Sequence, residues 1–323
     1  MLVGLFVNTQ KLTVAKEDHL TEFFAAALMS SERFSRAFVR LIFGDQDSRL
    51  ISKVETQVIY AGCRPDMRLI LSDDSIVLCE NKLDAAETIG NVESGNLLQL
   101  ERYLQLPVDH VIYIRSELLP PSYQVMSHPK YLSPIERPHY LWRDIYPLLC
   151  EDPNPIVGEL RDGFKNMGFV PAHPVIGDLT RNAPREQREN FSKFWIPTTT
   201  AAIQQGWKVA IGDVVERYFY HETAELAREV FVSPINPTRF LIRYTPQISQ
   251  CDALLSALDT VKSEAEAVVV VTKKTVSRAS GLATVIDVET PMNNVLPDQL
   301  KTVEQIESKL KGYVLPYLRL AFK

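Results

Sequence analysis

Two carboxylates and a lysine fall close together in the sequence, in a pattern suited to metal-assisted chemistry. Asp66 is followed, after thirteen residues, by Glu80-Asn81-Lys82. Alternation along a strand puts Glu80 and Lys82 on one face and Asn81 on the other. An acid and a lysine at the end of an apolar strand are costly to bury without a purpose. Asp66, at the start of the neighbouring strand, can bring a second carboxylate to the same place.

Two carboxylates that converge from adjacent strands make a hard-oxygen site suited to Mg²⁺, for which Mn²⁺ can substitute. Such a metal can polarise a phosphodiester oxygen and lower the pKa of a bound water. Lys82 would orient or deprotonate the attacking water and offset charge on the phosphate. The pattern is therefore suited to metal-assisted chemistry at a phosphodiester.

The site imposes a condition on the turn between the two strands. A two-residue turn at Asp73-Asp74 would pair Asp66 with Asn81, which faces the wrong side of the sheet. For Asp66 to share a metal with Glu80, the loop must have an odd length or one strand must carry a bulge. We predict one of these two arrangements.

The elements that must position these residues follow from periodicity. Apolar residues recur at helical spacing over 17–43, with Ser30-Ser31 as a break, and three extended segments follow. A short helix stopped by Pro107 and a further apolar strand come next. The order helix, three strands, helix, strand predicts an α/β fold. The expected strands are 50–60, 66–71, 76–82 and 108–114, and the expected later helices are 97–105, 141–150 and 156–167.

The segment from Glu55 to Tyr103 resembles the PD-(D/E)XK nuclease superfamily, as found in bacterial PD-(D/E)XK nuclease-like proteins. The resemblance extends more weakly over about the first 170 residues, through an acidic first helix and later helical segments. The matching elements are Glu17-Asp18-His19-Leu20-Thr21-Glu22, Glu55, Cys63-Arg64-Pro65-Asp66, Leu78-Cys79-Glu80-Asn81-Lys82-Leu83-Asp84-Ala85 and Gln99-Leu100-Glu101-Arg102-Tyr103.

The resemblance implies a restriction-endonuclease-like core, in which helices flank a mixed central sheet. It also implies roles: Asp66 and Glu80 as metal ligands, with the backbone carbonyl of Asn81 as a third, and Lys82 as a catalytic residue. Further candidates come from the same comparison. Gln99 would act in catalysis by contacting substrate or the lysine, and Tyr103 and Arg64 would join it in substrate binding. Glu17 is preferred over Glu22 as the metal ligand from the first helix, although the sequence does not separate these two.

The chain is long enough for two domains. We expect a nuclease-like domain over 1–180 and an α+β accessory domain over 185–323, for substrate recognition, partner binding or dimerisation. Basic residues gather at the expected boundary and after the apolar strand 268–272, where they either contact phosphates or form a charged strand edge that resists aggregation. These are Arg181, Arg185, Arg188 and Lys193, then Lys273, Lys274 and Arg278.

Charge and cysteine usage exclude several classes. The net charge of −5 disfavours a passive nucleic-acid coat but not an enzyme that gathers carboxylates around a metal. The four cysteines, Cys63, Cys79, Cys150 and Cys251, lack zinc-site spacing and predict reduced thiols in a cytoplasmic protein. No apolar run reaches membrane-spanning length, and no nucleotide-binding glycine motif is present.

The sequence thus predicts a magnesium-dependent (endo)deoxyribonuclease, with DNA favoured over RNA as substrate. The resemblance alone suggests a role in restriction or phage defence, and cutting both strands of a duplex would favour a homodimer. Two alternatives stay open. In the first, the core is a non-catalytic nucleic-acid-binding module. In the second, the chain is a subunit that is inactive without its partner.

Overall fold

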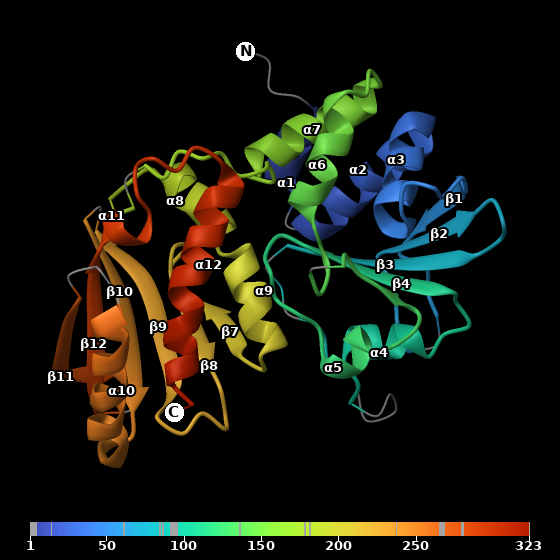
Figure 1. Ribbon diagram of the computed structural model, residues 1–323. Helices are drawn as coiled ribbons and strands as arrows, with labels where there is room; N and C mark the ends of the chain where they lie inside the picture. The colour runs from blue at the N-terminus through green and yellow to red at the C-terminus, as the bar shows by residue number, and fades with distance from the viewer. Residues whose placement is uncertain are drawn as a thin grey trace. The chain divides into compact units, whose positions relative to one another are not determined.

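The computed structural model describes most of the chain and divides it into two compact units, Met1–Pro171 and Ala172–Lys323. The architecture is mixed α/β, with one sheet in each unit (Figure 1). None of the described helices is long and apolar enough to cross a membrane. The described residues are 5–13, 15–60, 62–83, 85, 87–90, 96–135, 137–177, 179–180, 182–236, 238–264, 269–278 and 281–322.

The division between the units falls earlier than the sequence-based boundary between 1–180 and 185–323. The segment that follows Pro171 belongs with the second unit. Leu179 is buried in the second hydrophobic core, and the Asn190 side chain donates to the backbone carbonyls of His173 at 2.9 Å and Val175 at 3.0 Å.

The sheet of the first unit is mixed, as the order of its expected elements requires. Its first three strands are antiparallel neighbours, and the fourth runs parallel to the third because a helical crossover separates them. Two short strands then pair parallel to the fourth. The strands are β1 (Ile51–Thr56), β2 (Met67–Leu71), β3 (Ile76–Lys82), β4 (His110–Arg115), β5 (Tyr131–Leu132) and β6 (Tyr140–Leu141).

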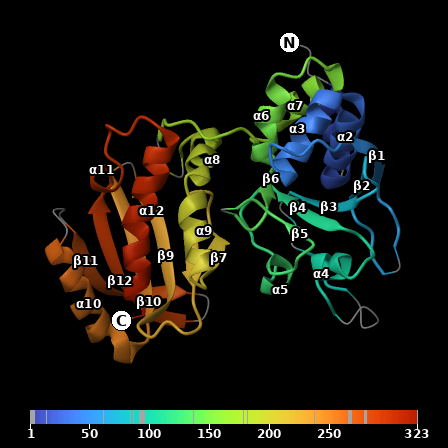
Figure 2. The same cartoon turned by 45° about the vertical axis from the view of Figure 1, so that its right-hand side comes forward.

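Helices cover both faces of this sheet (Figures 1 and 2). The break predicted at Ser30-Ser31 is confirmed: Ser31 is extended, and its hydroxyl caps the next helix by accepting the Phe34 N–H. One face packs against α1 (Leu5–Leu12), α2 (Lys16–Ser30), α3 (Glu32–Phe43), α6 (Trp142–Cys150) and α7 (Pro155–Asn166), and the other against α4 (Gln99–Leu104) and α5 (Tyr123–Met126).

Alternation along β3 decides which face each site residue occupies. Val77 and Cys79 belong to the core beneath α2, whereas Leu78 belongs to the smaller core beneath α4. Because side chains alternate, Glu80 and Lys82 share the α4 face with Leu78, and Asn81 points toward α2.

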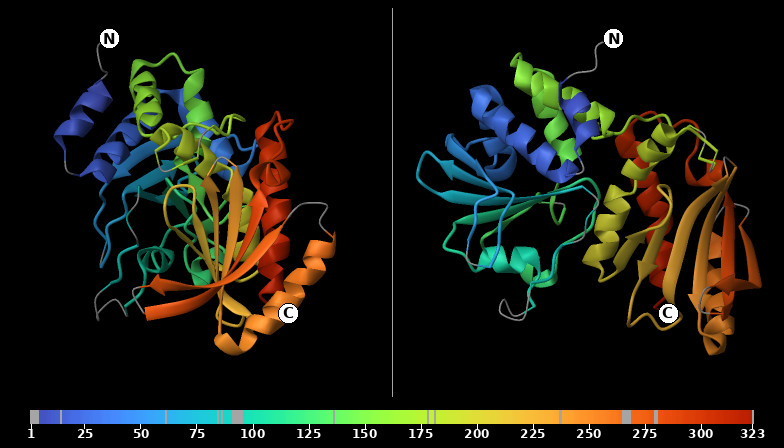
Figure 3. Two further views of the ribbon diagram at one scale, coloured as in Figure 1. Left: turned by 90° about the vertical axis from the view of Figure 1, so that its left-hand side faces the viewer. Right: turned by 180° about the vertical axis from the view of Figure 1, so that it is seen from behind.

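The second unit has an antiparallel sheet with its own core (Figure 3). Trp195, Phe240 and Tyr244 are fully or almost fully buried there, between the sheet and the helices. The sheet order is β11 (Val270–Arg278), β12 (Gly281–Pro291), β10 (Arg239–Pro246), β9 (Ala227–Asn236), β8 (Arg217–Tyr220) and β7 (Lys208–Ile211). The helices are α8 (Arg185–Lys193), α9 (Ile196–Gln204), η2 (Ile248–Gln250), α10 (Cys251–Glu264), α11 (Met292–Val295) and α12 (Val303–Leu320).

Four of the seven basic residues singled out in the second unit have carboxylate partners. Ion pairs join Arg185 to Glu189, Arg188 to Asp213, Lys273 to Asp252 and Lys274 to Asp287. Lys193 is largely buried, and Arg181 and the Arg278 side chain lie outside the described residues. Lys273 and Lys274 lie on β11, an edge strand, where charged side chains discourage pairing with another chain.

Candidate active site

The loop between β2 and β3 has an odd length, as predicted. The ladder pairs Met67 with Cys79, and the Leu71 N–H donates to the Ser75 carbonyl at 2.9 Å, which leaves a loop over 72–74. Asp74 adopts a left-handed φ of 67°, as in a type I turn followed by a left-handed residue. Continuing the register by one residue places Asp66 opposite Glu80, on the same face of the sheet.

The same register places Pro65 opposite Asn81, and this pairing leaves the Asn81 carbonyl without the N–H donor that a regular ladder would supply. Leu71 and Ser75 form a hydrogen-bonded pair of the antiparallel ladder. Because such pairs recur at every second residue, Pro65 and Asn81 occupy a position where a hydrogen-bonded pair is expected. Pro65 has no N–H to donate to the Asn81 carbonyl. The Asn81 N–H donates instead to Asp66 Oδ2 at 2.8 Å. The Asn81 carbonyl therefore receives no ladder hydrogen bond from Pro65.

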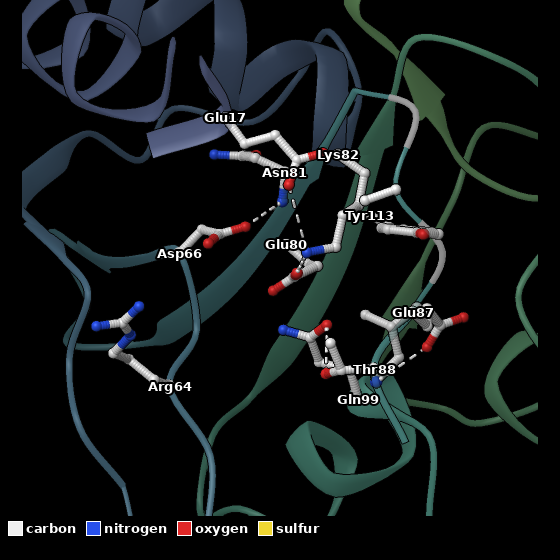
Figure 4. A network of polar contacts seen from close by, with 12 residues as sticks. Glu17, Arg64, Asp66, Glu80, Asn81, Lys82, Glu87, Thr88, Gln99 and Tyr113 are labelled. Atoms are coloured by element: carbon white, nitrogen blue, oxygen red, sulfur yellow. Dashed lines mark hydrogen bonds and ion pairs between the residues drawn. The ribbon is translucent and has the colours of Figure 1, made fainter. Parts of the chain in front are cut away.

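Lys82 lies between two carboxylates. Its Nζ is 2.6 Å from Glu80 Oε1 and 3.8 Å from Glu17 Oε2. Glu17 comes from the first turn of α2, and its Oε1 accepts the Leu83 N–H at 2.7 Å, which fixes the helix to the end of β3. Figure 4 shows Asp66, Glu80 and Lys82 turned toward one another, with Glu17 above them.

The two candidates on α2 have different surroundings. Glu17 contacts the site, whereas Glu22 is exposed. Between them, Thr21 is fully buried and accepts a hydrogen bond from Asn81 Nδ2 at 3.0 Å. Among the described residues, Glu17 is thus the α2 carboxylate that reaches Lys82.

Tyr103 and Gln99 lie beneath Glu80 rather than at its open side. The Tyr103 hydroxyl donates to Glu80 Oε2 at 2.7 Å and accepts from Gln99 Nε2 at 2.8 Å. The Tyr103 side chain is fully buried, so in this structure it orients Glu80 and is closed to substrate. Gln99, which was expected to contact substrate or Lys82, instead donates to Tyr103, and its Oε1 accepts from the Thr88 hydroxyl at 3.2 Å. Arg64 is exposed and borders Asp66.

The carboxyl groups of the site are held in conditions that disfavour their ionised forms. Burial, together with the nearby Asp66 carboxylate, raises the pKa of Glu80 to about 8. Burial also raises the pKa of Asp66, against the lowering effects of the Asn81 N–H and Lys82. Burial alone would lower the pKa of Lys82, but the surrounding carboxylates more than reverse this and raise it. The cluster is therefore short of positive charge.

The donor set suits a hard divalent cation. Glu80 Oε1 is buried and, apart from the ion pair with Lys82, accepts no well-directed hydrogen bond. Asp66, Glu80 and the Asn81 carbonyl would supply oxygen ligands of the kind that Mg²⁺ and Mn²⁺ prefer, with water or substrate completing the shell. No group of three or more His, Cys, Asp or Glu side chains arranged for a metal occurs within the described ranges. The site would thus rely on a backbone oxygen and on external ligands.

Sequence reasoning missed several residues that surround the site. Arg115 is almost fully buried and pairs in register with Lys82 on the parallel strand β4, and its Nη2 donates to the Ala85 carbonyl at 3.0 Å. A basic residue that ends the apolar run 111–114 was the available signal, since the same pattern marks Lys82. Thr21 and Thr88 carried no comparable signal, because their roles depend on segments distant in the sequence.

The chain was compared with protein-family models, with curated proteins and with solved structures, and none of the three comparisons found a match. The residues of the site therefore carry the functional proposal.

Proposed function

We propose that the chain is a metal-dependent nuclease with a restriction-endonuclease-like core, which hydrolyses phosphodiester bonds, most readily in DNA. Mg²⁺ is the expected cofactor, and Mn²⁺ substitutes for it. The observation that carries the proposal is the hairpin register, which sets Asp66 opposite Glu80 with Lys82 on the same face. The mixed sheet flanked by helices supports it, because the superfamily resemblance implies this arrangement.

In this proposal Asp66, Glu80 and the Asn81 carbonyl hold the cation, and Glu17 takes part from α2. When bound, the metal polarises the phosphodiester and acidifies water. Lys82 orients the attacking water and stabilises negative charge that develops on the phosphate. The Lys82 ammonium is well placed for this role because its side chain, only 10% exposed, is fixed between Glu80 and Glu17.

The test is cleavage by the purified protein of circular, linear and single-stranded DNA and of RNA, with Mg²⁺, Mn²⁺ or EDTA. Asp66→Asn and Lys82→Met should each lower the cleavage rate at least about 100-fold, as expected for groups that act in the transition state. Glu22→Gln is the matched control, because Glu22 is an exposed carboxylate of α2, and it should cleave as the wild type does.

Calorimetry with Mg²⁺ separates the alternatives when cleavage is not seen. Metal binding that is lost in Asp66→Asn, without cleavage of any substrate, would indicate a subunit that needs a partner. Absence of both metal binding and cleavage would contradict the nuclease proposal and leave a non-catalytic nucleic-acid-binding module.

A further inference from the structure

We infer that Arg102 and Thr88 are positioning residues, which fix the orientation of Glu80 through a hydrogen-bond relay of four side chains, Arg102, Thr88, Gln99 and Tyr103. The inference deepens the proposed function and rests on it for its consequence, since Glu80 is the proposed metal ligand. Neither Arg102 nor Thr88 touches the carboxylate itself. Figure 4 shows Thr88 and Gln99 in contact beneath Glu80.

The direction of the relay is set at Arg102. A guanidinium group donates hydrogen bonds and never accepts them. Arg102 Nη2 lies 3.3 Å from the Thr88 hydroxyl oxygen and 3.5 Å from the Thr88 carbonyl. Because the lone pair of the Thr88 hydroxyl faces this donor, its proton is available for Gln99 Oε1 at 3.2 Å.

The directions of the remaining hydrogen bonds follow from the donation of the Thr88 hydroxyl to Gln99. With Oε1 facing Thr88, the Gln99 amide must turn Nε2 toward Tyr103, to which it donates at 2.8 Å. The Tyr103 oxygen is then occupied as an acceptor, and its single proton has two possible acceptors, Glu80 Oε2 at 2.7 Å and the Arg64 carbonyl at 3.1 Å, of which Glu80 makes the shorter contact. Every donor in the relay thus points toward Glu80, which leaves Oε1 turned toward Lys82.

Arg102 also contacts the segment that precedes Asp66, the other proposed metal ligand. Its Nη1 donates to the Gly62 carbonyl at 2.7 Å, and the residues after Gly62 lead directly to Pro65 and Asp66. The Tyr103 hydroxyl lies 3.1 Å from the Arg64 carbonyl in the same segment. Arg102 therefore links the relay to the backbone segment that leads to Asp66. One side chain thus contributes to the positions of both Glu80 and Asp66.

The relay is tested by Thr88→Val, which keeps the branched shape but removes the hydroxyl, with Thr88→Ser as the conservative control. Mg²⁺ affinity is measured by calorimetry on the full-length protein. Thr88→Val should weaken Mg²⁺ binding about 5- to 10-fold, as expected for a lost hydrogen bond of about 1 kcal/mol. Thr88→Ser should stay within about twofold of the wild type. An unchanged Mg²⁺ affinity in Thr88→Val, or an equal loss in Thr88→Ser, would overturn the inference.

A second comparison asks whether the effect travels through Tyr103. In a Tyr103→Phe background, Thr88→Val should weaken Mg²⁺ binding no further, because the last donor of the relay is already gone. Simple additivity of the two changes would show that Thr88 acts by another route and would overturn the relay.

The wild type, Thr88→Val, Tyr103→Phe and the double variant are also unfolded in urea without metal, which separates failure of the relay from failure of the proposed function. If the wild type binds no Mg²⁺, the metal proposal falls, but the relay still predicts midpoint shifts for Thr88→Val and Tyr103→Phe that are not additive. Additive shifts would reject the relay whatever the metal result.

Discussion

At the scale of single residues, the site contains ionisable groups whose burial lowers the stability of the folded protein when they are charged. Glu80 is fully buried beside Asp66, and Lys82 is the cation that contacts it among the described side chains. Burial and the neighbouring Asp66 carboxylate favour the protonated form of Glu80 over its charged form. The protonation of Glu80 should therefore be visible in the stability of the metal-free protein.

We expect Glu80→Gln to stabilise the metal-free protein at alkaline pH. The pKa of Glu80 is raised from 4.5 to about 8 by burial and by Asp66, so between these pH values the folded state binds a proton that the unfolded state has lost. The wild type therefore loses stability as pH rises through this window. Glu80→Gln should lose less, by on the order of a few kcal/mol. Urea unfolding from pH 5 to pH 9 measures the difference, and parallel pH profiles would contradict it.

The two acids of α2 should respond differently to loss of charge. Glu17 caps the Leu83 N–H and faces Lys82, whereas Glu22 is exposed. Glu17→Gln should weaken Mg²⁺ binding about 10-fold or more and reduce cleavage, since it removes a charge beside the proposed cation. Glu22→Gln should change neither. Calorimetry and a cleavage assay on both variants measure this, and equal effects would assign Glu17 a structural role only.

At the scale of elements, local pattern predicts the site-bearing segments well. Strand 76–82 and the helix break at Ser31 follow from alternation and from capping chemistry, and both match the structure. The odd number of residues in the β2–β3 loop was predicted from one requirement, that Asp66 and Glu80 lie on the same face of the sheet. What could not be predicted depends on contacts between distant segments, such as Thr21 with Asn81 and Thr88 with Gln99. The sequence places a domain boundary between 180 and 185, yet the segment directly after it forms α8, whose Phe191 is buried in the second core.

Pro65→Ala should weaken Mg²⁺ binding while leaving the fold intact. The substitution supplies an N–H opposite Asn81, which can pair with the carbonyl that Pro65 leaves without a donor. The expected loss of Mg²⁺ affinity is about 3- to 10-fold, because one ladder hydrogen bond now competes with the cation. Calorimetry measures the affinity, and urea unfolding checks that stability is equal or higher. An unchanged affinity would mean that the Asn81 carbonyl is not a ligand.

At the scale of the whole molecule, each unit has a sheet and a hydrophobic core of its own. The proposed catalytic residues, including Glu17, all lie in Met1–Pro171. Their positions depend on α2, the β2–β3 hairpin and α4, and the contacts that carry the site stay within that unit.

We expect residues 1–171 to fold without the rest of the chain and to retain Mg²⁺ binding. The fragment keeps the complete first core and every residue of the proposed site. It should unfold cooperatively in urea and bind Mg²⁺ within about threefold of the full-length affinity, as expected for an independent domain. A fragment that lacks a cooperative transition would show that the second unit is needed for folding. Cleavage with altered substrate preference would assign recognition to the second unit.

The short loop at 72–74 has a consequence for how this protein can vary. Its residues are exposed, and at such loop tips most proteins accept both substitutions and insertions. Here the two kinds of change are not equivalent. Substitutions leave the number of residues unchanged, but a single insertion or deletion would move Asp66 out of step with Glu80. In a library of random variants, or among descendants of this chain, the loop should therefore vary in composition, with Gly, Asn or Asp favoured at the left-handed position 74, and stay fixed in length wherever the site is in use.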